Sequence, residues 1–169
     1  MLDRLFVAMR AALFGTAFVG FWGWAALWMR RIDSTPGAAA PSHSPLIGAV
    51  VLATGAMLAL ASIIAFVVRG RGTPAPFDPP RVFVATGPYR FIRNPMYVGG
   101  WLALVGLGIV EHSAAMVAFS VAWLGLAHAF VVGYEERTLA ERFGDDYLDY
   151  CQRVPRWLPV TRRRTLRRS

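Results

Sequence analysis

Long apolar runs without charge dominate the chain and predict membrane-spanning helices. Residues 11–29 and residues 44–68 contain no charged side chain. As helices, both are long enough to cross the roughly 30 Å hydrocarbon core of a bilayer. The first run is longer than the core of a typical secretory signal peptide, so we interpret it as a membrane helix.

A second pair of apolar runs predicts a helical hairpin. Residues 96–110 are barely long enough to span the hydrocarbon core, and residues 114–134 are apolar apart from His128. Only residues 111–113 separate the two runs, which predicts a tight turn between antiparallel helices. Small residues at helical spacing let one face of the first helix approach a neighbour closely. These are Gly99, Ala103 and Gly106.

An amphipathic segment, residues 135–150, follows the hairpin. Its apolar residues recur at intervals of four, four and three, which predicts one apolar helix face that is interrupted at Gly144. These residues are Leu139, Phe143, Tyr147 and Tyr150. The proline-containing stretch 154–159 ends this helix, and the prolines and glycine of residues 30–44 predict a loop.

The pattern therefore predicts an all-α fold. It is a polytopic membrane helix bundle with about four transmembrane helices and a cytoplasmic C-terminal amphipathic helix. We divide the chain into N-terminal membrane helices (residues 1–76), a region with the polar connector, the hairpin and the amphipathic helix (residues 77–160), and a basic tail (residues 161–169).

The composition agrees with a membrane protein. Of 169 residues, 56% are hydrophobic and only 17% are charged, whereas soluble domains average about 25% charged residues. The net charge is +8, and every basic residue is an arginine. The arginines cluster beside the apolar runs and in the tail, which favours a bilayer with anionic lipids as the partner over nucleic acid.

The arginines also predict the orientation of the chain. Both open ends of the hairpin must lie on one side of the membrane, and both are rich in arginine, so that side is cytoplasmic. Residues 69–93 contain five arginines and one aspartate, whereas the loop 30–44 contains two arginines and one aspartate. With two helices before the hairpin, we expect both termini in the cytoplasm and this loop outside.

Cysteine and histidine usage argues against a metal site. Cys151 is the single cysteine, which excludes an intramolecular disulfide and a cysteine-rich metal centre. The three histidines are isolated, and neither HExxH nor CxxC spacing occurs. We therefore expect no metal cofactor.

The connector, residues 77–100, is polar, aromatic and rich in proline although it lies between apolar runs. Gly-Pro at positions 87–88 predicts a turn, and Asn-Pro at positions 94–95 predicts the start of the next helix. We expect the free N–H groups of that helix start to face the same interface as Arg90 and Arg93. Together these donors could hold a carboxylate.

Two adjacent carboxylates, Glu135 and Glu136, stand at the inner end of the fourth helix. Such a pair resists desolvation and stays ionised only if a cation or hydroxyl groups lie against it. His128 precedes Glu135 by seven residues and is expected on the same helix face. An ionisable residue in a membrane helix is a functional candidate, although a lone histidine can equally be a packing partner.

The polar residues and their spacing resemble those of a known family. The matching motifs are Gly87-Pro88-Tyr89-Arg90, Arg93-Asn94-Pro95-Met96-Tyr97-Val98-Gly99, Glu135-Glu136 with Leu139, Phe143-Gly144 with Tyr147 and Tyr150, and Val154-Pro155-Arg156. Their order and separation resemble the isoprenylcysteine carboxyl methyltransferase and phospholipid methyltransferase superfamily. The resemblance covers residues 77–159, and residues 1–76 match only in general character.

The resemblance implies an integral membrane methyltransferase that uses S-adenosylmethionine. The residues that it implies at the cofactor are Gly87, Pro88, Tyr89, Arg93, Asn94, Pro95, Tyr97, Glu135 and Glu136. Many members have histidine where this chain has Asn94, and asparagine cannot titrate near neutral pH. A role for Asn94 as a proton acceptor is therefore not expected.

The implied acceptor is lipophilic and reaches the site laterally from the bilayer. Arg142 and Arg153 could pair with an anionic acceptor headgroup, and with His128 they are the catalytic candidates. The sequence leaves the acceptor open among a phosphatidylethanolamine nitrogen, an isoprenoid carboxylate and a small thiol. A non-catalytic membrane scaffold or a small transporter subunit is the alternative from a different class.

Overall fold

The computed structural model describes residues 2–33, 45–70 and 82–159, with side chains of the first helix from residue 9 onward apart from positions 11 and 14. The division at residues 76–77, the start of the connector, most of the predicted loop 30–44 and the basic tail lie outside the described residues.

All regular elements in the described part of the chain are helices, which confirms the all-α prediction. Its elements are α1 (Leu2–Asp33), α2 (Pro45–Ala65), the π-helix η1 (Phe66–Gly70), the 3₁₀ helix η2 (Gly87–Arg90), α3 (Pro95–Val110), α4 (Ala114–Phe130), the π-helix η3 (Val131–Glu135) and α5 (Glu136–Arg153).

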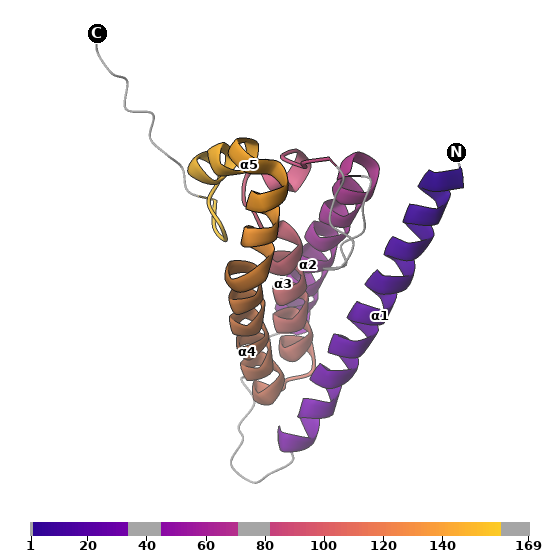
Figure 1. Ribbon diagram of the computed structural model, residues 1–169. Helices are drawn as coiled ribbons and strands as arrows, with labels where there is room; N and C mark the ends of the chain where they lie inside the picture. The colour runs from indigo at the N-terminus through magenta and orange to yellow at the C-terminus, as the bar shows by residue number, and fades with distance from the viewer. Residues whose placement is uncertain (1, 34–44, 71–81, 160–169) are drawn as a thin grey trace.

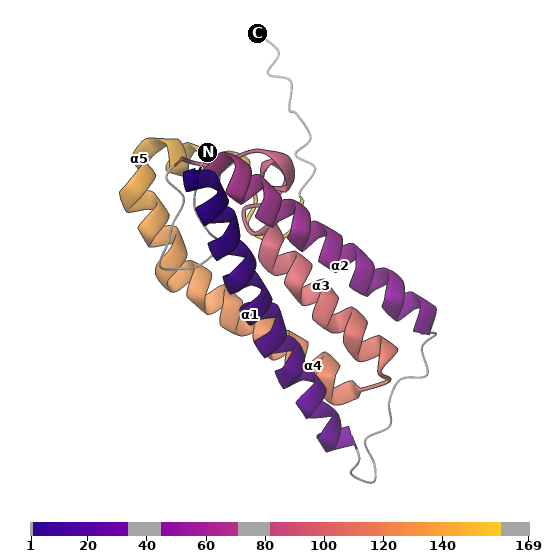
Figure 2. The same cartoon turned by 90° about the vertical axis from the view of Figure 1, so that its right-hand side faces the viewer.

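Two helical stretches are long and apolar enough to cross a membrane. They are Pro45–Gly70 and Ala114–Arg153, and α3 is a shorter apolar helix. In the bundle, α2, α3 and α4 lie side by side, and α5 lies at the end where α1 begins (Figures 1 and 2). The number of membrane spans and the cytoplasmic position of α5 stay predictions.

Small residues bring α2 and α3 into backbone contact. A Cβ added at Gly55 would lie 2.4 Å from the Ala103 nitrogen, and one at Gly99 would lie 2.5 Å from the Ala59 nitrogen. Side chains at these positions would therefore push the two backbones apart. The predicted close approach of this helix face is confirmed, and its partner is α2.

Aromatic side chains hold α1 against α4. The Trp22 ring centroid lies 6.1 Å from that of Trp123 in an edge-to-face arrangement and 6.0 Å from that of Phe119. Trp123 is buried, and its ring also lies 6.3 Å from Tyr97 of α3. This cluster therefore connects α1 to the part of α3 that carries site residues.

The turn between α3 and α4 is fixed both locally and by α1. His112 adopts a φ of 50°, and the Ser113 hydroxyl accepts a 3.0 Å hydrogen bond from the Met116 nitrogen. At the end of α1, Asp33 accepts a 3.1 Å hydrogen bond from the Ala115 nitrogen. These acceptors satisfy N–H groups that the first turn of α4 leaves without partners. The predicted tight turn is confirmed.

Candidate functional site

The connector between α2 and α3 packs onto α5. Gly87 has a φ of 61°, which glycine adopts without a steric penalty, and Pro88 stands in the first turn of η2. Tyr89 is buried, and its carbonyl accepts a 2.6 Å hydrogen bond from the Tyr150 hydroxyl. The Phe83 ring packs edge-on at 5.0 Å from the Tyr150 ring. The Gly-Pro turn thus lets the connector pack against α5.

Arg93 joins the connector to two other segments. Its NH1 lies 2.9 Å from Glu136 Oε1 and 3.1 Å from Cys151 Sγ, both on α5. Its backbone N–H donates to the Pro155 carbonyl at 2.9 Å. The Nε atom is buried with no acceptor among the described residues. Arg93 therefore retains an unfilled hydrogen-bonding position, and a buried donor of this kind is costly to leave without an acceptor.

Glu136 is neutralised by two arginines. Besides the contact with Arg93, its Oε1 accepts from Arg156 Nε at 2.8 Å and its Oε2 accepts from Arg156 NH2 at 2.9 Å. Two-point pairs of this kind are among the strongest hydrogen-bonded contacts. The hydrogen bond to Glu136 raises the pKa of Arg156 above the already high value of a free arginine, so Arg156 stays charged. Asn94 Nδ2 donates to the Arg156 carbonyl at 3.3 Å.

Glu135 has a different environment from that of its neighbour. Its Oε2 accepts a 2.9 Å hydrogen bond from the Tyr97 hydroxyl. In the part of the chain that the structure describes, its carboxylate forms no ion pair. Because a carboxylate accepts about four hydrogen bonds, Glu135 can take further donors. Burial, with the charge of Glu135 adding, raises the pKa of the Tyr89 phenol, so Tyr89 stays neutral.

The π-helix η3 determines how the carboxylates are presented. It lies between His128 and Glu136, and its wider turns change which side chains share a helix face. Glu135 therefore contacts α3, whereas His128 is exposed and its Nδ1 accepts a 3.1 Å hydrogen bond from Trp157 Nε1. The expectation that His128 and Glu135 share one face is wrong, because it assumed an uninterrupted α-helix.

Arg90 does not face the start of α3. Its side chain is exposed, and its guanidinium lies 5.4 Å from the centre of the Phe91 ring. The expectation that Arg90 and Arg93 share one interface is therefore wrong. The 3₁₀ turn of η2 directs these two arginines to different surroundings.

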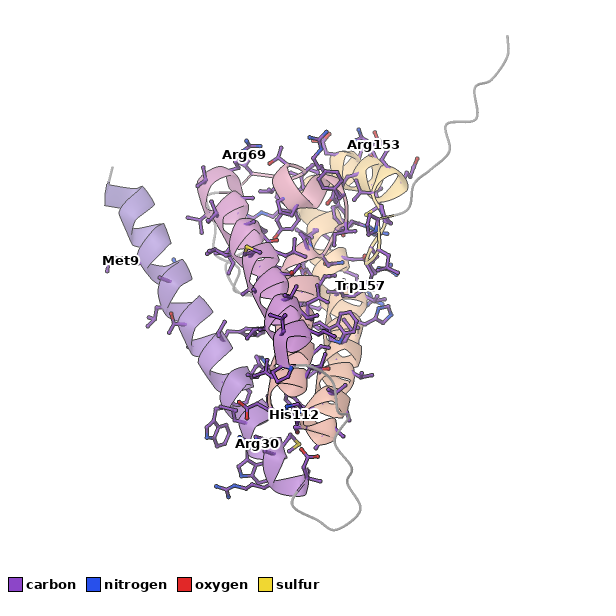
Figure 3. All side chains as sticks on the ribbon, turned by 180° about the vertical axis from the view of Figure 1, so that it is seen from behind. Met9, Arg30, Arg69, His112, Arg153 and Trp157 are labelled. Atoms are coloured by element: carbon purple, nitrogen blue, oxygen red, sulfur yellow. The ribbon has the colours of Figure 1, made fainter. Side chains whose placement is uncertain are left out.

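Arg142 and Arg153 are both exposed on α5. Arg153 Nε donates to the Asp149 carbonyl at 3.2 Å. Figure 3 shows Arg153 at the same end of the molecule as Arg69. Neither Arg142 nor Arg153 contacts the two glutamates in the described contacts, and their predicted pairing with an acceptor stays a prediction.

The nine residues implied at the cofactor form two groups in the structure. The side chains at the meeting of the connector, α3 and α5 are those of Tyr89, Arg93, Asn94, Tyr97, Glu135 and Glu136. The others shape the backbone and are Gly87, Pro88 and Pro95. The structure thus brings together segments that are about forty residues apart, and their cofactor contacts stay predictions.

The sequence analysis assigned no role to Arg156 or Cys151. Both contact the arginine–glutamate cluster at hydrogen-bond distance. A signal for Arg156 was present, because a pair of adjacent acids at a membrane boundary requires cations. Periodicity could not identify Arg156 as one of them, because the chain reverses direction after α5.

Comparison with known proteins agrees with this geometry. Residues 44–146 match the phospholipid methyltransferase family. The match covers more than half of the chain and includes the connector, the hairpin and both glutamates. The chain belongs to the phospholipid methyltransferase family. The resemblance that the motifs indicated is confirmed.

Curated relatives of this family member match over shorter stretches. The chain is 35% identical over 78 residues to protein-S-isoprenylcysteine O-methyltransferase B of Arabidopsis thaliana, covering 45% of the chain and 39% of that protein. It is 33% and 34% identical over 76 residues to the nickel-cobalt-cadmium resistance protein NccN of Alcaligenes xylosoxydans xylosoxydans and the cobalt-zinc-cadmium resistance protein CzcN of Cupriavidus metallidurans. Each of these two matches covers 45% of the chain and 35% of the relative. The chain therefore spans little more than a third of the length of these relatives.

Proposed function

We propose that this protein is an integral membrane methyltransferase that transfers a methyl group from S-adenosylmethionine to a lipophilic acceptor. The observation that carries the proposal is the contact between the connector and α5 in a chain of this family. There Arg93 meets Glu136, and Tyr97 of α3 meets Glu135. Desolvated acids and arginines are costly, and a scaffold of packed helices would not need them.

The free hydrogen-bonding positions of this cluster suit S-adenosylmethionine, which carries a carboxylate, an ammonium, a ribose diol and a sulfonium. Glu135 has acceptor positions left for a cation or hydroxyl groups. Among the residues that the structure describes, Arg93 Nε has no acceptor and no side chain caps the start of α3, so donors remain for a carboxylate. The residues present therefore fit the cofactor.

Bound S-adenosylmethionine would supply an activated methyl group on a good leaving group. The residues of the chain would hold the acceptor close to the methyl group, aligned and away from water. A carboxylate acceptor needs no base, whereas an amine or thiol acceptor must lose a proton. Asn94 cannot take that proton near neutral pH.

The proposed acceptor is a lipid-like molecule that enters from the bilayer. Large apolar side chains are exposed on α1 and α2, among them Val19 and Met57, as expected for surfaces that face lipid. The name of the family refers to phospholipids, and the name of the plant relative refers to a prenylated cysteine. Both names describe an acceptor with a lipid tail. The names of the two metal-resistance relatives state no reaction.

We also propose a multi-pass topology with both termini in the cytoplasm. The end that carries Arg69 and Arg153 would face the cytoplasm (Figure 3). At the opposite end, Arg30 pairs with Glu111 at 2.6 Å, so part of the positive charge there is neutralised. Arg30 therefore adds less net positive charge to the end that is proposed to lie outside.

Ligand-dependent thermal stability tests the proposal. S-adenosylhomocysteine should raise the unfolding temperature of the detergent-purified protein, because a ligand that binds only the native state stabilises it. Glu135→Ala should abolish this increase, whereas Arg30→Ala, at the opposite end of the molecule, should keep it. An unchanged unfolding temperature of the wild type at saturating ligand would favour a scaffold. Transfer of a labelled methyl group into a lipid extract would identify the acceptor.

A further inference from the structure

The two adjacent glutamates differ in what already neutralises them. We infer that they have different roles: Glu136 is a positioning residue that fixes Arg93 and Arg156, and Glu135 alone faces the bound cofactor. The inference rests on the proposed function and assigns roles within the same site. It departs from the family resemblance, which implied both carboxylates at the cofactor.

The residues that follow α5, 154–159, form a strap that lies against the connector. The Arg93 N–H donates to the Pro155 carbonyl at 2.9 Å, and Asn94 Nδ2 donates to the Arg156 carbonyl at 3.3 Å. These bonds attach the strap to the residues at which α3 begins. The strap is therefore fixed beside the residues that carry the site.

Aromatic contacts hold the strap at its two ends. Val154 is buried in a cluster with Tyr147 and Tyr150 of α5. Beyond Arg156, the Trp157 indole donates to His128 Nδ1 of α4. The backbone is thus fixed on both sides of Arg156, which directs its guanidinium at Glu136.

Glu136 is nearly saturated by these partners. Oε1 accepts from Arg93 NH1 and Arg156 Nε, and Oε2 accepts from Arg156 NH2, so three of about four acceptor positions are occupied. Its side chain is 18% exposed and that of Arg93 is 15% exposed. The three side chains together carry one positive charge, so a cationic ligand gains little attraction from Glu136.

Glu135 remains available because its single described partner is neutral. The Tyr97 hydroxyl orients its carboxylate with one hydrogen bond and leaves its charge uncompensated. A cation placed against Glu135 would therefore meet a carboxyl group that no described ion pair neutralises, in a partly buried setting. The two carboxylates are adjacent in sequence, yet only one is available to a ligand.

Charge balance gives a test that separates the two roles. Glu136→Gln leaves two guanidinium groups without a counter-ion, and Arg156→Gln removes the two-point pair. The double variant Glu136→Gln/Arg156→Gln restores the single positive charge of the wild-type cluster and keeps amide groups that can hydrogen-bond. If Glu136 acts by holding Arg156, the double variant should lose no more than the more damaging single variant loses.

The first measurement uses the protein without ligand. Hydrogen exchange of the Arg93 amide reports whether the strap is bound to the connector, because that N–H donates to the Pro155 carbonyl. Exchange should accelerate about tenfold in Glu136→Gln and in Arg156→Gln. It should stay at the wild-type rate in Glu135→Gln. Equal rates in Glu136→Gln and the wild type would overturn the positioning role, whether or not the protein binds a nucleoside.

The second measurement is the affinity for S-adenosylhomocysteine. Glu135→Gln should weaken binding about tenfold or more, and adding Arg156→Gln to it should restore nothing. Glu136→Gln should also weaken binding, and adding Arg156→Gln to it should weaken binding by no more than about threefold further. Arg156→Lys should fall between the wild type and Arg156→Gln, because lysine keeps the charge without the two-point geometry.

The outcomes distinguish this inference from the proposed function. A double variant whose loss of affinity equals the sum of the two single losses would show that Glu136 acts independently of Arg156, and would overturn the division of roles. Failure of the wild type to bind S-adenosylhomocysteine would overturn the proposed function and the role of Glu135 with it. In that case the exchange rates would still decide whether Glu136 holds the strap.

Discussion

Gly106 of α3 and Leu52 of α2 are in backbone contact: a Cβ added to Gly106 would lie 2.3 Å from the Leu52 nitrogen. That atom belongs to the backbone and cannot rotate away, so Gly106→Ala must separate the two helices. We expect a loss of about 2 kcal/mol or more of unfolding free energy, in the middle of the usual range for overpacking or above it. Unfolding by SDS in mixed micelles, followed by circular dichroism, measures this loss.

Gly125 of α4 provides the matched control. A Cβ at this position would meet nothing within 4 Å, so Gly125→Ala should cause no loss of stability. Equal stability of the two alanine variants would contradict the close packing of α2 and α3.

The Tyr97 hydroxyl should matter for the ligand more than for the fold. Tyr97→Phe keeps the ring that packs near Trp123 and removes the 2.9 Å hydrogen bond to Glu135. Without this donor the carboxylate is less well oriented, and we expect S-adenosylhomocysteine affinity to fall roughly tenfold. Titration calorimetry in detergent measures the affinity. A loss of thermal stability with unchanged affinity would show that the hydroxyl is only structural.

His128 should contribute little to ligand binding. Its side chain is exposed and its described partner is Trp157 of the strap, so it does not reach the glutamates. His128→Ala should leave S-adenosylhomocysteine affinity within about threefold of the wild type, because it removes one exposed hydrogen bond worth about 0.5 kcal/mol, the low end of the usual range. A loss comparable to that of Glu135→Gln would return His128 to the catalytic candidates.

Asp33 should stabilise the hairpin from outside it. Its carboxylate accepts from the Ala115 nitrogen and contacts the Ser113 hydroxyl, so it caps α4 from the end of α1. Asp33→Ala should cost about 1 kcal/mol, as the loss of a helix cap does. Glu111→Gln is the control, because it removes only an ion pair with the half-exposed Arg30. Thermal unfolding of both variants compares them.

The helices were predictable from sequence because lipid-facing and core-facing residues of a membrane helix are both apolar. The run 44–68 corresponds to α2. The turn at residues 111–113 was predictable because only three residues separate the two apolar runs. The close approach of α3 to a neighbour followed from the spacing of Gly99 and Gly106, whereas its partner did not. Spacing within one helix defines a face, but the opposing surface depends on tertiary packing.

The site was predictable in part, for a related reason. The need of Glu135 and Glu136 for cations or hydroxyls follows from electrostatics, and the structure supplies both kinds of partner. Which carboxylate receives which partner depends on η3, because a π-helical turn shifts side chains by a fraction of a turn. The residues of η3 include no proline, and a single glycine, Gly133, does not distinguish a π-helical turn from an α-helical one. The position of His128 was misjudged for this reason.

Gly144 provides a last test, because it links the two halves of α5. Its φ of 53° and ψ of −130° lie in a region that other residues occupy only under strain, so the helix bends there. The bend directs Tyr150 and Cys151 back towards the connector. Gly144→Ala should therefore cost about 1–3 kcal/mol of stability and loosen the connector.

Gly133→Ala is the comparison for this variant, because a Cβ at Gly133 would also meet nothing within 4 Å and its backbone lies outside the positive-φ region. The two variants add the same methyl group to one continuous helical stretch, so a difference between them isolates the backbone angle. We expect faster hydrogen exchange of the Arg93 amide in Gly144→Ala only. If the two variants exchange alike, the bend does not hold the connector, and the contact between Tyr150 and the Tyr89 carbonyl must persist without it.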